Sequence, residues 1–265
     1  MMYIDVHTHL TDEKFQPDLE EVIARASQAG LGAIVVNGID PDSNRQTLEL
    51  AKRWPIVRAA LGIYPVSAVA HLSSKALPFD VVRFDSNLEL EFIRSQAHAG
   101  HLWGLGECGL DGHWVGEETF GEQERIFETF IALALDTDLP LIVHTRKLEK
   151  RAGDILRTAG ATKVIFHCFG GPMEMAQRYA EVDGWWFSIP ANARRNKAFT
   201  RMLATLPADK ILTETDAPYL PPDKGQRNEP CNVTRTIALL AELRGWSESQ
   251  ARQVVCDNFM KLGAN

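Results

Sequence analysis

The stretch YIDVHTHL, residues 3–10, is an apolar run that ends on two histidines, His7 and His9. Its length and composition are typical of a buried strand, and side chains along a strand alternate between two faces. Asp5, His7 and His9 are therefore expected to point the same way. Runs of the same kind recur along the rest of the chain, and this recurrence predicts the fold.

Short apolar runs alternate with segments of helical spacing. We predict eight strands, at residues 3–8, 33–39, 56–63, 101–107, 140–145, 163–169, 184–189 and 210–216. The predicted helices cover residues 18–30, 43–53, 86–98, 117–136, 149–159, 172–182, 195–205, 232–244 and 247–260. Continuous apolar strands that alternate with amphipathic helices are typical of a parallel sheet covered by helices.

Eight such units in 265 residues fit a closed (β/α)8 TIM barrel, which we predict as a single α/β domain over residues 1–265. An open doubly wound sheet is the alternative, but no glycine-rich phosphate loop follows the first strand. Gly30 and Gly160 stand where two of the predicted helices should end, as expected of C-terminal glycines. The barrel is the favoured interpretation.

Composition excludes some classes of function. The chain has 28 basic and 35 acidic residues, a net charge of −7, so no basic field indicates nucleic-acid binding, although bound divalent cations can reverse the local sign. We find neither a signal-peptide pattern nor an apolar run long enough to cross a membrane, so we expect no membrane association. The 4 cysteines lack paired spacing, which favours a reducing, cytoplasmic location.

Further histidines and acids fall at the ends of other predicted strands. Glu107 ends the fourth strand, His144 the fifth, His167 the sixth and Asp216 the eighth. The carboxyl ends of barrel strands meet at one mouth, where catalytic groups of this fold lie. Burying so many polar groups there without a cation would carry a large desolvation cost. The sequence therefore predicts a metal site formed by His7, His9, Glu107, His144, His167 and Asp216.

Six ligands are more than one tetrahedral ion needs, so we predict two divalent ions about 3.5–4 Å apart with a shared carboxylate. Glu107 comes from between the two groups and is the expected bridge. One ion is assigned to His7, His9, Glu107 and Asp216, and the other to Glu107, His144 and His167. Imidazole and carboxylate together suit Zn²⁺ or Mn²⁺, and Mg²⁺ less well.

A centre with two ions acidifies bound water and holds the attacking and leaving oxygens of a displacement, which predicts a hydrolase. Asp216 is expected to orient that water or accept its proton, with Glu107 as its catalytic partner. Asp5 and Glu214 share the parity of the ligands one layer deeper. They either orient the ligating imidazoles or are buried acids bonded to backbone or to each other. Arg146 binds a phosphate or carboxylate, or holds its loop by a salt bridge.

Seven phrases resemble the TatD family of metal-dependent deoxyribonucleases, within the amidohydrolase-like superfamily. They are DVHTHL (5–10), ALGIYP (60–65), GLGECGLD (104–111), LIVHTR (141–146), FHCFGG (166–171), LTETDAPYL (212–220) and RNEP (227–230). The resemblance implies a TIM barrel, a divalent-metal centre and 3′-5′ exonuclease hydrolysis of DNA, at single strands or ends. Its metal ligands fall on the six residues named above. Tyr64 stands where the family commonly has a histidine that is thought to contact substrate phosphate, so Tyr64 is a substrate-binding candidate.

Two other functions stay open from the sequence. A related barrel hydrolase would act on a small lactone, amide or phosphoester, and many such relatives bridge their metals with a carboxylated lysine on the fourth strand. The segment HLWGLGECGL (101–110) has Glu107 and no lysine, which favours the nuclease. The acidic net charge and Tyr64 favour the small substrate. A non-enzymatic interaction module is the third interpretation, and a complete ligand set argues against it. No obligate protein partner is inferred.

Overall fold

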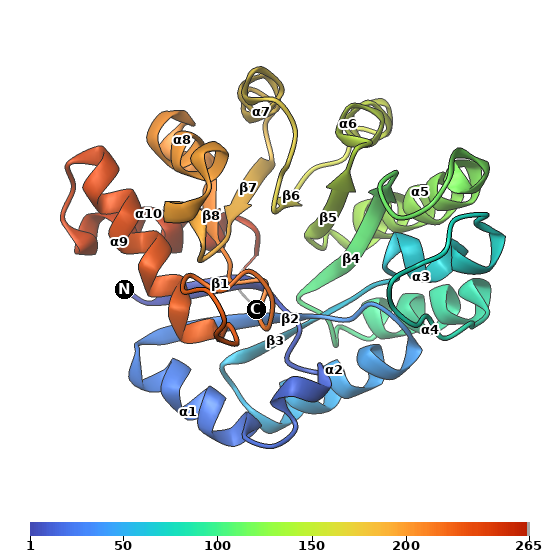
Figure 1. The fold of residues 1–265 in the computed structure, drawn as a ribbon, viewed down its shortest axis with the longest axis horizontal. Coiled ribbons are helices and arrows are strands. Elements are labelled where there is room, and N and C mark those ends of the chain that lie inside the picture. The colour runs from blue at the N-terminus through green and yellow to red at the C-terminus, as the bar shows by residue number, and fades with distance from the viewer. Residues whose placement is uncertain (264–265) are drawn as a thin grey trace.

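The computed structural model describes residues 1–263, and eight parallel strands form its centre (Figure 1). They are β1 (Tyr3–Thr8), β2 (Leu31–Asn37), β3 (Val57–Leu61), β4 (Gly104–Asp111), β5 (Leu141–Arg146), β6 (Val164–His167), β7 (Trp185–Ile189) and β8 (Ile211–Thr213). Each strand pairs with the next in sequence order. The ring closes through a parallel bridge between Thr8 and Ala217, just beyond β8. The predicted (β/α)8 TIM barrel is confirmed.

Helices surround the strands on the outside of the ring (Figure 1). They are α1 (Leu19–Gln28), α2 (Pro41–Arg53), α3 (Pro65–Val69), α4 (Ser86–His98), α5 (Phe120–Thr137), α6 (Glu149–Thr158), α7 (Met173–Ala180), α8 (Lys197–Thr205), α9 (Val233–Arg244) and α10 (Glu248–Lys261). The short helix α3 was not predicted. No helix within residues 1–263 combines the length and apolar character that a membrane crossing requires.

Local chemistry explains where the helices begin and end. Asp40 caps α2 by accepting the N–H of Ser43, and the Ser43 side chain accepts the N–H of Asp40 in return. Gly30 and Gly160 follow α1 and α6 with φ of 89° and 68°, a conformation that glycine adopts without steric cost. The eight strands are almost wholly buried. In β7, the buried Trp185 indole donates a hydrogen bond to the Ala161 carbonyl at 2.8 Å.

Most strand ends lie within two residues of the prediction, but the carboxyl ends of β4 and β8 differ by more. Strand β4 was expected to end at Glu107 but continues to Asp111, which pairs with Arg146 of β5. Gly109 permits this because its φ is 137° and a Cβ there would collide with the His144 backbone. Strand β8 was expected to reach Asp216 but ends at Thr213. Asp111 is therefore in the barrel wall, whereas Asp216 belongs to the loop after β8.

Candidate metal centre

Four of the predicted ligands bring one atom each to a common point. His7 Nε2 lies 3.5 Å from Glu107 Oε2 and 3.7 Å from Asp216 Oδ1. His9 Nε2 lies 3.5 Å and 3.4 Å from the same two oxygens, and 3.1 Å from His7 Nε2. Ligand atoms bound to one tetrahedral ion at about 2.1 Å would be about 3.4 Å apart. These spacings fit the ligand shell of a single cation.

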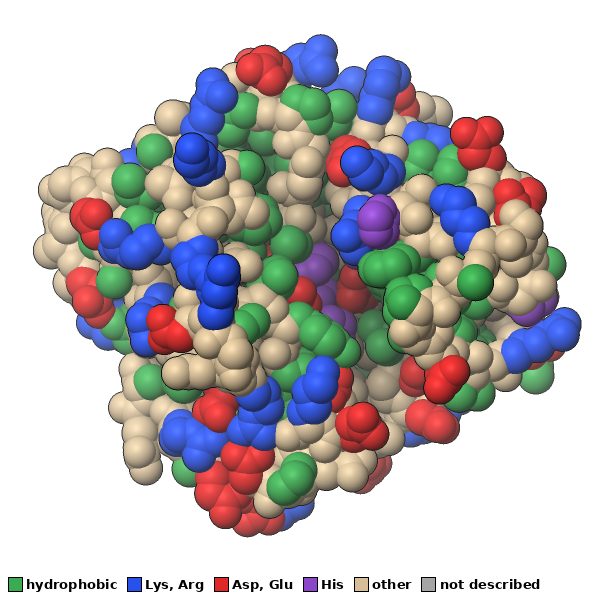
Figure 2. All heavy atoms as spheres, viewed as in Figure 1, with side chains coloured by type: hydrophobic (Ala, Val, Ile, Leu, Met, Phe, Trp, Pro, Cys, Tyr) green, Lys and Arg blue, Asp and Glu red, His purple; other side chains and the backbone are tan. Residues whose placement is uncertain are grey.

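A second group of ligands lies on the other side of Glu107. Glu107 Oε1 is 2.8 Å from His144 Nδ1. Ligand atoms of Glu107, His144 and His167 all lie within 4.8 Å of one another. The His167 ring stacks on His7, with centroids 3.5 Å apart. The two oxygens of Glu107 thus face two different groups. Figure 2 shows histidine and acidic side chains at the bottom of a hollow on this face.

Acceptors behind the rings fix the orientation of two imidazoles. His9 Nδ1 lies 3.1 Å from the backbone oxygen of Asn37 on β2. His167 Nδ1 lies 2.9 Å from Glu214 Oε2, which follows β8. Because an oxygen acceptor requires an N–H, Nδ1 is the donor in each ring, and Nε2 is the nitrogen turned toward the cluster. Within residues 1–263, His7 Nδ1 has no hydrogen-bond partner.

The pKa values of the cluster separate His7 and Glu107 from the other imidazoles. Burial, reinforced by the charge of His167, lowers the pKa of His7 to about 3, so its imidazole is neutral. Burial alone would raise the pKa of Glu107, but hydrogen bonds with His144 and His7 outweigh it and hold that pKa well below its usual range. Cations bind ionised carboxylates and neutral imidazoles, so Glu107 and His7 are in the required state at neutral pH. Burial lowers the pKa of His9, His144 and His167, but the neighbouring carboxylates outweigh it and raise all three, so a cation would displace a proton from each of these rings.

A turn, and not a strand, places Asp216 in the cluster. Its φ of 58° is in the left-handed region, which non-glycine residues rarely adopt and which recurs at functional sites. Its N–H donates to the carbonyl of His7 at 2.9 Å. Asn228 holds the following loop, because its amide donates to the carbonyls of Thr215 and Tyr219, each at 2.7 Å.

Asp5 and Glu214 differ in what they contact. The Asp5 carboxylate accepts the backbone N–H of His7 at 3.2 Å and that of Thr215 at 3.0 Å, and burial raises its pKa to about 8. Within the described chain its contacts include no imidazole ring. Glu214 accepts from the His167 ring and from the backbone N–H of Cys168 at 3.1 Å. Of the two acids, only Glu214 orients a predicted ligand.

Tyr64 and Arg146 lie beside the second group. The Tyr64 ring packs edge-on against His144, with centroids 5.0 Å apart, and burial next to Glu107 raises the pKa of its hydroxyl. Arg146 is exposed, and its guanidinium lies 5.3 Å from the centre of the Trp114 ring. In the part of the chain that the structure describes, Arg146 forms no ion pair. Its charge is thus available to an anion.

Asp111 is the functional neighbour that the sequence interpretation missed. It is fully buried, and its Oδ2 lies 3.0 Å from His144 Nε2. Counting by twos along β4 from Glu107 through Gly109 reaches Asp111, so the same alternation that groups the histidines would have found it. It was missed because the fourth strand was ended at Glu107.

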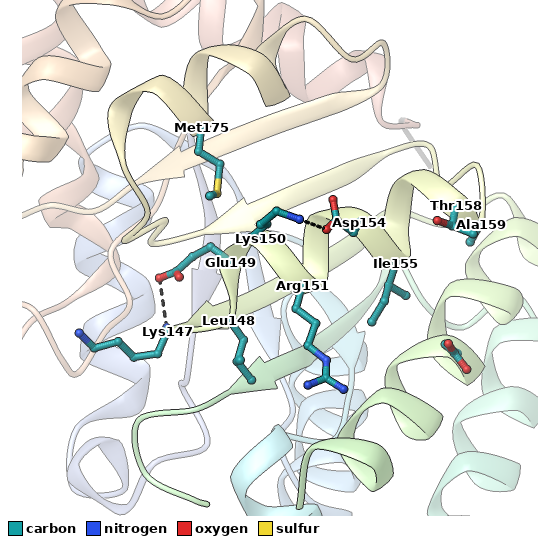
Figure 3. Close-up of a pocket in the computed structure, with 11 residues that line it drawn as sticks. Lys147, Leu148, Glu149, Lys150, Arg151, Asp154, Ile155, Thr158, Ala159 and Met175 are labelled. Carbon is teal, nitrogen blue, oxygen red and sulfur yellow. Dashed lines mark hydrogen bonds and ion pairs between the residues drawn. The ribbon is translucent and has the colours of Figure 1, made fainter. Parts of the chain in front are cut away.

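A separate hollow of about 830 Å³ lies on the outside of the barrel (Figure 3). Leu148 and Ile155 line it from the segment that includes α6, and Met175 lines it from α7. Lys150 and Asp154, also in its wall, pair with each other across one turn of α6. Within residues 1–263, its lining includes none of the six predicted ligands. Convergence of ligand atoms, and not the size of a hollow, identifies the candidate site.

An eight-stranded barrel with imidazoles and carboxylates gathered at the carboxyl ends of its strands defines the class of metal-dependent barrel hydrolases. The sequence model of the TatD related DNase family matches residues 4–263. The chain therefore belongs to the TatD related DNase family, and the predicted family is confirmed.

Three similar proteins illustrate the relationship. The uncharacterized metal-dependent hydrolase YabD of Bacillus subtilis is 31% identical over an alignment 266 positions long, which covers 98% of this chain and 98% of its own. The 3′-5′ ssDNA/RNA exonuclease TatD of Pectobacterium parmentieri is 28% identical and covers 97% of this chain and 98% of its own. The crystal structure of YJJV, a TatD homolog from Escherichia coli, superposes with a TM-score of 0.84 at 27% identity, over 98% of this chain and 97% of the other.

Proposed function

We propose that this protein hydrolyses phosphodiester bonds of DNA, at single strands or ends and from the 3′ terminus, with two divalent ions held by the six clustered residues. The observation that carries the proposal is the position of Glu107, whose two oxygens face two separate groups of ligand atoms. The spacing of those atoms fits bound cations. A relative whose name specifies single-stranded DNA and RNA supports the choice of substrate.

The proposed ions are Zn²⁺, Mn²⁺ or Mg²⁺, one held by His7, His9, Glu107 and Asp216 and the other by Glu107, His144 and His167. Ions bound there would supply an acidified water and positive charge for the phosphate. Burial opposes ionisation of Asp216, but the His9 hydrogen bond and the neighbouring histidines outweigh it and lower its pKa. An ionised Asp216 is able to orient the attacking water and to accept its proton.

The substrate is proposed to meet Arg146 and Tyr64 beside the ions. The Arg146 guanidinium suits a phosphate oxygen, because it binds anions through two parallel N–H groups. The Tyr64 hydroxyl donates one hydrogen bond but carries no charge. The net charge of −7 does not oppose this, because two divalent ions would reverse the sign at the mouth.

The proposal extends to the cellular location and to the domain organisation. All four cysteines are free, in agreement with a reducing, cytoplasmic location. Residues 1–265 are proposed to form one catalytic domain without an obligate protein partner; residues 264 and 265 lie outside the described part of the chain.

A small lactone, amide or phosphoester is the second candidate substrate, and Tyr64 is the observation that favours it. An uncharged, partly buried ring stands against His144, where a cationic side chain would attract a polyanion more strongly. A small neutral ester would not need that charge.

The test uses purified protein with Mn²⁺ or with chelator, and single-stranded DNA labelled at either end. We expect metal-dependent loss of 3′-terminal nucleotides, abolished in Asp216→Asn and kept in Asp183→Asn, which changes an exposed aspartate before β7. Intact DNA despite bound metal would transfer the proposal to the small substrates, assayed with a lactone and a p-nitrophenyl phosphodiester. Near-normal turnover in Asp216→Asn would remove the role given to that residue.

A further inference from the structure

We propose that Asp111 is a positioning residue that fixes the tautomer of His144 and, with its other oxygen, the turn that carries Trp114. The inference rests on the proposed metal site and adds to it a residue that ties one ligand to the rim of the mouth. Asp111 ends β4, and its carboxylate is fully buried, so no solvent replaces the contacts that it makes.

The first contact determines which nitrogen His144 offers. His144 Nδ1 faces Glu107 at 2.8 Å, and Nε2 faces Asp111 Oδ2 at 3.0 Å. His9 and His167 have the opposite arrangement, with Nδ1 behind and Nε2 toward the cluster. An ionised carboxylate only accepts hydrogen bonds, so Asp111 keeps a proton on His144 Nε2, and Nδ1 is the nitrogen that would give up its proton to a cation. Asp111 thereby turns His144 Nδ1 toward Glu107, beside the position proposed for the second ion.

The second contact holds the chain beyond β4. Asp111 Oδ1 accepts the backbone N–H of His113 and that of Trp114, each at 2.8 Å, as aspartates do in turns. Gln123 of α5 fixes the backbone of Asp111 itself, accepting its N–H at 2.8 Å and donating to its carbonyl at 3.0 Å. One carboxylate thus connects the ring of a predicted ligand to the backbone of Trp114.

The turn places Trp114 in a wall beside the mouth. The Arg146 guanidinium lies 5.3 Å from the indole centre, and the Phe79 ring meets the indole edge-to-face at 5.4 Å. Phe79 is 42% exposed. Figure 2 shows basic, histidine and hydrophobic side chains beside the hollow on this face. A cation among aromatic rings is chemistry that holds phosphate and unpaired bases, so Asp111 joins the ion site to the surface that would receive the strand.

Asparagine at position 111 separates the two contacts. Its single oxygen is needed by the two backbone N–H groups, so its NH₂ must face His144 Nε2. That nitrogen then has to accept, and the ring proton moves to Nδ1, where it points at Glu107. Asp111→Asn therefore keeps the turn and turns the lone pair of His144 away from the ion, whereas Asp111→Ala loses both contacts.

The experiment measures Mn²⁺ content and affinity by calorimetry and elemental analysis, with the Trp114 turn followed by near-ultraviolet circular dichroism. Glu89→Gln is the matched control, because Glu89 is a buried acid bonded to Asn44 and Arg45, away from the imidazoles. We expect Asp111→Asn to weaken one of two Mn²⁺ sites about 10- to 100-fold while the dichroism and the other site stay unchanged. Asp111→Ala should alter the dichroism as well, and Glu89→Gln neither.

Two Mn²⁺ ions bound with wild-type affinity by Asp111→Asn would overturn the tautomer role. An altered turn signal in Asp111→Asn would overturn the separation of the two contacts. If Asp111→Ala does not fold, the comparison of Asp111→Asn with wild type still tests whether Asp111 fixes the tautomer of His144. Nuclease activity is not among these readouts, so wild type that binds two ions but spares DNA refutes the proposed function alone. Wild type that binds fewer than two ions overturns the role of Asp111 and the ion site together.

Discussion

Replacing Glu107 with glutamine should leave one ion bound where the wild type binds two. Glu107 Oε1 lies 2.8 Å from His144 Nδ1, and Oε2 lies 3.5 Å from both His7 Nε2 and His9 Nε2. Glutamine has the same shape but only one oxygen, and its NH₂ has no lone pair for a cation. One of the two groups therefore keeps an oxygen ligand and the other loses it.

The size of the effect follows from the linkage between binding and stability. An ion at 100 times its Kd stabilises the folded state by about 2.7 kcal/mol, so two ions that bind in sequence, each at 100 times its own Kd, contribute about 5.4 kcal/mol. In a domain of this length each kcal/mol raises Tm by about 2–4 °C. Saturating Mn²⁺ should therefore raise the Tm of wild type by about 11–22 °C, and that of Glu107→Gln by about half as much.

Scanning calorimetry with and without Mn²⁺, together with the metal content of the dialysed protein, measures both quantities. Glu89→Gln makes the same chemical change in a buried acid outside the cluster and should show the full shift. Two ions and a full shift in Glu107→Gln would refute the shared carboxylate. No shift in any variant, including wild type, would refute the ion site itself.

Three further substitutions test residues that surround the candidate site. Gly62→Ala should lower the free energy of unfolding, measured in urea, by about 1–3 kcal/mol, because the new Cβ would collide with the Glu107 backbone. Gly121→Ala is the control, since a Cβ at Gly121 would meet open space. Equal stability of the two variants would contradict the close approach at Gly62. Tyr64→His should lower the KM for single-stranded DNA several-fold, and an unchanged KM would place Tyr64 outside the substrate path. The Arg227 hydrogen bond lowers the pKa of Asp18 to about 2, so stability from this pair is present above pH about 4 and lost as pH falls toward 2. The difference in unfolding free energy between wild type and Asp18→Asn should shrink across that window, and a constant difference would disprove the linkage.

Alternation along a regular strand was enough to predict that His7 and His9 face one cluster. Both follow an apolar run whose parity is unambiguous, and parallel strands in a barrel end at the same mouth. The same rule fails where the end of the strand is misjudged. The fourth strand was ended at Glu107, but it continues through Gly109, and Gly106 and Gly109 lie where β5 passes too close for a side chain. Asp111 was lost with the last four residues of that strand.

Asp216 lies in the predicted cluster, but alternation along a strand is not what places it there. The residue was grouped with Glu214 as part of one strand, but β8 ends at Thr213 and Asp216 has left-handed backbone. Its position depends on a hydrogen bond to the carbonyl of His7, some 210 residues earlier in the chain. A pattern read within ten residues contains no information on that contact, because the contact exists only once the barrel has closed.

The folded barrel also determines which nitrogen three of the four imidazoles turn toward the cluster, and this is the part of the site that is hardest to predict from the sequence. His9 on β1 finds its acceptor on the neighbouring strand β2, at the Asn37 carbonyl, and His144 on β5 finds its acceptor on β4, at Asp111. His167 on β6 takes Glu214, from beyond β8. The ring that loses its acceptor is free to change tautomer, since the two forms of a free imidazole differ little in energy. The nitrogens that His9, His144 and His167 turn toward the cluster therefore depend on acceptors supplied by other strands and loops, and short sequence motifs do not contain those contacts.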